Sequence, residues 1–137
     1  MPFTLISHTA DVALDVSAPT KPKLFEEAAR GYQYLLLEKQ ECHALEDYII
    51  QLDGVDHESL LVKWLSELAY IFETKQQIAC DFKILSLKNN HLRAKVGFVP
   101  YDPKIYSIQN DVKAVTYSDL KIEKTSKGFK TRIVFDI

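Results

Sequence analysis

The sequence lacks the features that mark several specialised classes of protein. Its 137 residues include only four glycines and five prolines, too few for a disordered or low-complexity chain. No apolar run approaches the roughly 20 residues of a membrane helix, and the N-terminal residues lack the basic and apolar segments of a signal peptide. With 17 basic and 19 acidic residues, the formal net charge is -2, which argues against indiscriminate binding of nucleic acid.

Cysteine is scarce as well, because Cys42 and Cys80 are the only two and do not have the spacing of a metal-binding pair. We therefore expect a reducing, cytoplasmic location. No glycine-rich phosphate loop and no G-x-S-x-G motif is present, and the four histidines lack the spacing of zinc ligands. These absences leave hydrolase, kinase and dehydrogenase activities without support.

The composition, with 47% hydrophobic and 26% charged residues, predicts a single domain over residues 1–137. Apolar residues repeat every three to four positions in two segments, which predicts amphipathic helices over 21–37 and 57–74. Thr20 and Asp56 stand where the N-caps of these helices are expected. The only tryptophan, Trp64, makes the second helix the candidate for the centre of the core.

The other apolar segments alternate with polar residues, as strands do. The predicted strands are residues 12–16, 47–53, 79–88, 91–99, 111–123 and 128–137, with a loop over 100–110. Turns are expected at Asn89-Asn90 and around Lys127-Gly128. The order β-α-β-α-β-β-β-β, with hairpins at the end, favours an α+β fold in which two amphipathic helices pack on a largely antiparallel or mixed β-sheet.

Two acidic residues stand out at the ends of predicted strands. Asp11 follows His8 at the entry to the first strand, where a polar turn capped by its own side chains is the commoner arrangement. In the last strand Asp136 lies on the face opposite Phe135, and the α-carboxylate of Ile137 is next to it. Neighbouring anionic groups repel each other unless a cation bridges them, the alternative being a hydrated terminus in solvent.

Basic residues outnumber acidic ones by six to four in the C-terminal residues 111–137. Such an excess is usually the solvated face of a hairpin, the alternative being a contact with RNA or an acidic partner. Lys113 shares a predicted face with Val115 and Tyr117, where a lysine usually extends to solvent. The alternative is that the Lys113 side chain lies close to carboxylates or a phosphate.

Four short motifs occur in order along nearly the whole chain. They are His8-Thr9-Ala10-Asp11-Val12, Asp56-x-x-x-Leu60-Leu61-x-x-Trp64-Leu65, Val112-Lys113-Ala114-Val115-Thr116-Tyr117 and the final Asp136-Ile137. In this combination the sequence resembles the archease family. The resemblance implies a non-catalytic cofactor of the GTP-dependent RNA ligase that joins 2′,3′-cyclic-phosphate or 3′-phosphate ends to 5′-hydroxyl ends in tRNA splicing and RNA repair. It implies that the protein promotes guanylylation of the ligase and its multiple turnover.

The resemblance also implies a divalent cation held by Asp11, Asp136 and main-chain oxygens of Ile137. Such hard oxygen ligands favour Ca²⁺ or Mg²⁺. His8, Lys113 and Asp56 are further candidates for contact with the ligase, and RNA is expected to be reached only through the ligase. The sequence departs from the usual family pattern at Phe98, in the histidine-free 100–110 loop and at Ser118.

Two other functions compete with this interpretation. The first is an RNA-binding chaperone or an adaptor for RNA-modifying enzymes, which the net charge of -2 does not favour. The second is a metal-dependent hydrolase in which Asp11 and Asp136 surround an activated water, with His8 as the candidate base.

Overall fold

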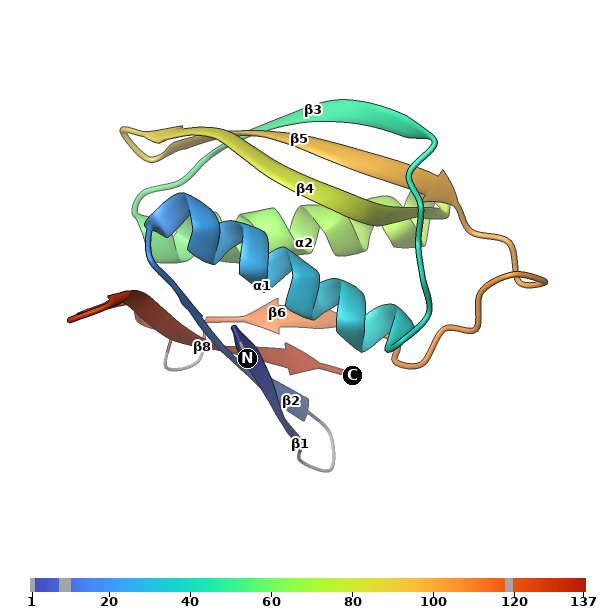
Figure 1. The fold of residues 1–137 in the computed structure, drawn as a ribbon, viewed down its shortest axis with the longest axis horizontal. Coiled ribbons are helices and arrows are strands. Elements are labelled where there is room, and N and C mark those ends of the chain that lie inside the picture. The colour runs from blue at the N-terminus through green and yellow to red at the C-terminus, as the bar shows by residue number, and fades with distance from the viewer. Residues whose placement is uncertain (1, 8–10, 118–119) are drawn as a thin grey trace.

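The chain forms three layers, in which two helices lie between two β-sheets (Figure 1). The computed structural model describes all residues except 1, 8–10 and 118–119. Its elements are, in chain order, β1 (Phe3–Ser7), β2 (Asp11–Ala18), α1 (Lys21–Leu37), β3 (Glu46–Asp53), α2 (His57–Lys75), β4 (Gln77–Lys88), β5 (His91–Pro100), β6 (Ala114–Thr116), β7 (Glu123–Thr125) and β8 (Gly128–Asp136).

Both sheets are antiparallel, which confirms the predicted α+β class. One sheet has the order β1-β2-β8-β6, with β7 also paired to β8, and the other has the order β3-β5-β4. The expected single sheet is therefore two sheets, one on each side of the helices. Strand β1 was not predicted, because its five residues form a strand only by pairing with β2.

The predicted strand over 111–123 is wrong, because among the described residues of this region only Ala114–Thr116 and Glu123–Thr125 are extended in a sheet. Between them, other groups take the hydrogen bonds that a continuous strand would have made. The main-chain N–H of Ile122 donates to Glu58 Oε2 on α2 at 3.0 Å, and Thr131 Oγ1 donates to the carbonyl of Lys121 at 2.9 Å. β6 and β7 consequently pair with opposite ends of β8.

The two helices begin at the predicted caps. The Thr20 side chain accepts a hydrogen bond from the N–H of Lys23 at 3.3 Å, and Asp56 Oδ1 accepts one from the N–H of Ser59 at 2.7 Å. Ser59 Oγ in turn accepts from the N–H of Asp56, which completes a capping box. These local signals explain why the helices were predictable from sequence.

The core fills the space between the helices and the sheets. Trp64 is fully buried, and its indole N–H donates to the carbonyl of Phe25 at 2.9 Å, which ties α2 to α1. Helix α1 also approaches β2 closely at Gly31. A Cβ atom there would lie 2.4 Å from Cδ2 of Leu14, so any larger residue would require Leu14 or the helix to move.

Cys42 and Cys80 form a disulfide that joins the α1–β3 connection to β4, with their Cα atoms 5.5 Å apart. The pairing was not predicted, since two cysteines 38 residues apart carry no local signal for it. A reducing compartment does not favour disulfides, so this bond does not support the location expected from the cysteine count. Among the described helices, none is long and apolar enough to cross a bilayer.

Candidate functional site

Asp11 and Asp136 lie directly opposite each other at one end of the β2–β8 pair. Directly opposed residues of antiparallel strands have Cβ atoms about 5 Å apart and project from the same face of the sheet. That face is the outer one, because the alternate residues Val12 and Phe135 are buried in the core. The structure therefore brings the two predicted ligands together, although they are separated by nearly the whole chain.

The Asp11 carboxylate is in an unusual environment for a charged group. Its Oδ1 is buried and has no hydrogen-bond partner among the described residues. Burial of an unpaired carboxylate oxygen is unfavourable, and an oxygen-binding cation would satisfy it. Two carboxylates and nearby main-chain oxygens are the ligand types that Ca²⁺ and Mg²⁺ prefer, so the residues fit such an ion.

The donor set at this position has few side chains. Within the described ranges, no group of three or more His, Cys, Asp or Glu side chains could hold a metal ion. A cation here could take further oxygens from the main chain, and Ile137 directly follows Asp136. The evidence for a cation site is therefore the pair of opposed aspartates and the buried Asp11 Oδ1, which has no partner among the described residues.

The end of β8 is held in place from three directions. Phe135 is fully buried, and Ile137 packs against the same core cluster. The carbonyl of Asp136 accepts a hydrogen bond from the main-chain N–H of Lys113 at 2.8 Å. Ala114 pairs with Asp136 on the side away from Asp11. The Asp136 side chain is thus exposed on a fixed backbone.

The remaining predicted residues divide into two groups. Lys113 lies beside the aspartate pair through its main-chain bond to Asp136, and its side chain is exposed. Asp56 does not join them, because the N-terminus of α2 contacts Ile122 near the beginning of β8, whereas Asp136 ends that strand. Asp56 serves as an N-cap. The prediction for His8 lies outside the described residues, as does the departure at Ser118.

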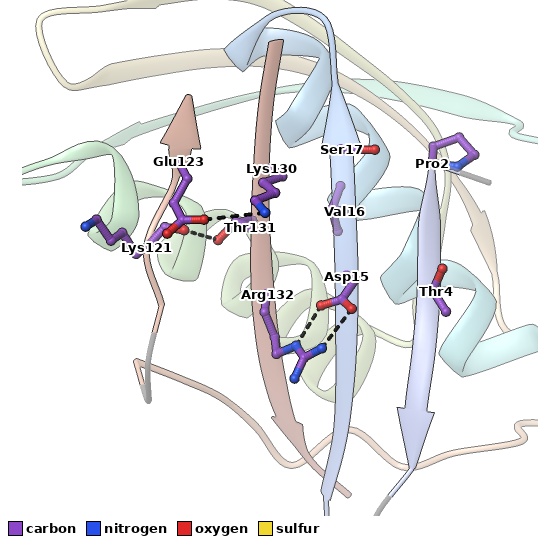
Figure 2. A pocket seen from close by; sticks show the side chains of 10 residues that line it. All are labelled: Pro2, Thr4, Asp15, Val16, Ser17, Lys121, Glu123, Lys130, Thr131 and Arg132. Carbon is purple, nitrogen blue, oxygen red and sulfur yellow. Dashed lines mark hydrogen bonds and ion pairs between the residues drawn. The ribbon is translucent and has the colours of Figure 1, made fainter. Parts of the chain in front are cut away.

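The same outer face continues into a shallow groove along β2 and β8 (Figure 2). There the guanidinium of Arg132 donates two hydrogen bonds to Asp15, at 2.7 and 2.9 Å, and Lys130 lies 3.8 Å from Glu123. The hydrogen bond from Arg132 lowers the pKa of the Asp15 carboxyl below its ordinary value. Two of the basic residues that make up the C-terminal excess, Arg132 and Lys130, are therefore paired with acidic residues.

Sequence reasoning missed the Asp15–Arg132 pair. Both residues occupy outward positions of their strands, which the alternation of polar and apolar residues does indicate. What alternation cannot supply is the register that places Asp15 opposite Arg132 and, by the same offset, Asp11 opposite Asp136.

Known proteins resemble this chain along nearly its whole length. The sequence matches the Archease protein family over residues 3–137. It is 30% identical to Protein archease of Methanosarcina mazei, covering 98% of this chain and 95% of that protein. It is 32% identical to Protein archease of Methanopyrus kandleri, with complete coverage of both chains at 100%.

Two solved structures have the same fold. A solution structure of a Methanobacterium thermoautotrophicum protein superposes with a TM-score of 0.82 at 25% identity, covering 99% of each chain. A crystal structure from Thermotoga maritima, described as an archease and possible chaperone, superposes with a TM-score of 0.65 at 22% identity, covering 96% of this chain and 94% of that one.

Proposed function

The chain belongs to the archease family, and from that premise we propose that it is a non-catalytic cofactor of a GTP-dependent RNA ligase. The ligase would join 2′,3′-cyclic-phosphate or 3′-phosphate RNA ends to 5′-hydroxyl ends in tRNA splicing and RNA repair. The cofactor would promote guanylylation of the ligase and allow repeated turnover. It would contact RNA only indirectly, through the ligase.

The observation that carries this proposal is the buried Asp11 oxygen opposite Asp136, which has no hydrogen-bond partner among the described residues. Asp11, Asp136 and the main-chain oxygens of Ile137 would hold Ca²⁺ or Mg²⁺. When bound, the cation supplies positive charge and Lewis acidity at this end of the sheet. The chain itself holds the ligands in fixed positions, because core packing and the hydrogen bond from the Lys113 N–H fix the backbone of the last strand.

The role of the surrounding residues follows from their placement. Lys113 is exposed and its main-chain N–H bonds to Asp136, so we infer that its ammonium group can contact an acidic or phosphate group of the partner near this end of the sheet. Binding of this end to the ligase would favour the ligase conformation that accepts the guanylyl group. That effect is a shift between ligase conformations and requires no bond to be made or broken on this chain.

The test is a ligation assay with the RNA ligase of the same organism, GTP and a divalent cation. We expect the ligase alone to stop after about one turnover and the mixture with this protein to continue, since product release and re-guanylylation then recur. Equal turnover with and without the protein would contradict the proposal. A salt-dependent affinity for RNA without ligase would instead favour the RNA-binding alternative.

A further inference from the structure

Strand β3 leaves one backbone edge unpaired along its eight residues. It pairs with β5 on one side, and no other described strand pairs with it. Its sequence, EDYIIQLD, has no lysine, proline or glycine, and Tyr48 and Ile49 have 52% and 47% of their surface exposed. Exposed apolar edge strands of this length tend to pair with another chain unless the fold protects them.

The other described edges are protected. β6 and β7 have three residues each, and β1 has five. β4 is long but has two register shifts, and side chains of α1 occupy some of its backbone groups. Gln33 Nε2 donates to the carbonyls of Ala79 and Cys80 at 3.2 and 3.1 Å, and Glu26 Oε2 accepts from the N–H of Ile84 at 2.9 Å. On β3 the comparable contact is at its last residue, where Lys63 Nζ donates to the carbonyl of Asp53 at 2.6 Å.

A groove runs beside the free edge, between β3 and the flank of α2. Tyr48 and Leu52 from β3 and Ile71 from α2 are among the apolar residues that line it. An extended segment added to β3 would direct alternate side chains over this groove, because successive side chains of a strand point to opposite faces. Glu67, Lys75 and Gln77 line the groove as well, so the site offers backbone pairing together with a surface of mixed apolar and polar side chains for every second residue.

The charged side chains of β3 indicate which kind of strand could pair with its free edge. β3 has acidic residues at both ends, Glu46 and Asp47 at one and Asp53 at the other, and no basic residue. Lys95 lies 3.6 Å from Asp47 and His91 lies 2.6 Å from Asp53, but both belong to β5, on the side of β3 away from the free edge. If two copies of β3 paired antiparallel along all eight residues, Glu46 would lie opposite Asp53, and like charges directly opposed are destabilising. A strand with basic ends would have the complementary pattern.

We propose that the free edge of β3 binds an extended segment of another protein, with alternating apolar residues at its centre and lysine or arginine at its ends, as an added β-strand. This surface belongs to the sheet on the far side of the helices from Asp11 and Asp136 (Figure 1). The proposal is thus independent of the cation site and of the ligase function. A failure of either one leaves the other intact.

The probe is a short synthetic peptide of alternating valine and threonine with lysines at both ends, titrated into isotopically labelled protein and followed by NMR. We expect the amide signals of residues 46–53 to shift and Ile49→Lys to weaken binding about tenfold or more. Leu85→Lys is the matched control, since Leu85 is a 41%-exposed apolar residue on β4, the opposite edge strand of the same sheet. It should bind the peptide as the unmodified protein does.

Two further peptides separate backbone pairing from simple adhesion to an apolar groove. In each, alternate amides are N-methylated, so that one peptide loses the N–H groups of one edge and the other loses those of the opposite edge. Only one of the two should lose binding, and a peptide with glutamates in place of the lysines should bind about tenfold more weakly. Equal behaviour of the two methylated peptides, shifts outside β3 and α2, or self-association of the protein that Ile49→Lys abolishes would each overturn the proposal.

Discussion

Asp11 faces Asp136 across the β2–β8 ladder in the same way that Asp15 faces Arg132 further along the two strands. The second pair is neutralised by a two-fold hydrogen bond between opposite charges. The first pair combines two negative charges, one of them with a buried oxygen that has no partner among the described residues. The contrast between these pairs is the basis of the cation assignment.

The effect of Asp11→Asn on stability should change sign when a divalent cation is added. In a chelator the variant should be more stable than the unmodified protein by about 0.2–1 kcal/mol, because it relieves the like-charge pair. With Ca²⁺ or Mg²⁺ in excess it should be less stable, because only the unmodified protein gains binding energy, about 2.7 kcal/mol at one hundred times Kd. Denaturant unfolding with and without the cation measures both effects.

The control for this comparison is Asp15→Asn, which removes a carboxylate from the same face of the same strand. It should keep the stabilisation by the cation while losing the contact with Arg132. Equal stabilisation of Asp11→Asn and the unmodified protein by the cation would refute the assignment of Asp11 as a ligand.

Reduction of the Cys42–Cys80 disulfide should lower the free energy of unfolding by about 2–4 kcal/mol. The bond restricts the unfolded chain across 38 residues, so its loss mainly stabilises the unfolded state. Urea unfolding with and without dithiothreitol gives the value, and the double variant Cys42→Ala/Cys80→Ala, which no longer has the bond, should not respond to the reductant. An unmodified protein with the same urea midpoint under both conditions would contradict the prediction.

Unfolding should become easier as the pH falls through the titration of His57. Partial burial, and then the positive charge of Lys21, lower the pKa of His57 below its ordinary value, against opposing contributions from Glu58 and Asp56. Lys21 Nζ donates to Nδ1 of the neutral ring at 2.9 Å, which protonation would prevent. Because the pKa is lower in the folded state, the unfolded chain takes up the proton first, and stability is lost below about pH 6.5.

The measurement is the pH dependence of the unfolding free energy between neutral and mildly acidic pH, compared with that of His57→Gln. The variant should have a shallower decline, and the His57 ring signals in NMR should titrate below the value of a free histidine. Titration at or above that value would show that the contact with Lys21 does not control the proton.

Gly31→Ala should destabilise the fold by about 1–3 kcal/mol. The added methyl group would lie 2.4 Å from Cδ2 of Leu14, so α1 would have to move away from β2 or Leu14 would have to shift. In the double variant with Leu14→Ala the two losses should be less than additive, because the smaller side chain makes room for the methyl group. Strict additivity would mean that the close contact has no energetic role.

Local signals explain which parts of the fold were predictable from sequence. Both helices begin at Thr20 and Asp56 as predicted, since a cap depends only on residues within one turn. The turn at Asn89-Asn90 is confirmed by positive φ angles of 50° and 58° at these two residues.

Most of the missed features depend on contacts between residues far apart in the sequence. The segment near Ile122, for example, bonds to Glu58 on α2 and not to a neighbouring strand. Strand β1 is the exception, because it pairs with β2, the next strand in the chain. Neither the disulfide nor the register that opposes Asp11 to Asp136 can be obtained from spacing along the chain. The resemblance to archeases proposed the two aspartates as partners, and the register then placed them together.

The most direct test of the central claim is the rate of guanylylation of the cognate ligase in the presence of Asp11→Asn. The matched control is Asp81→Asn, which makes the same change at an exposed position in the other sheet. We expect Asp81→Asn to accelerate guanylylation as the unmodified protein does, whereas Asp11→Asn, still folded, should give no acceleration. Full acceleration by Asp11→Asn would contradict this expectation.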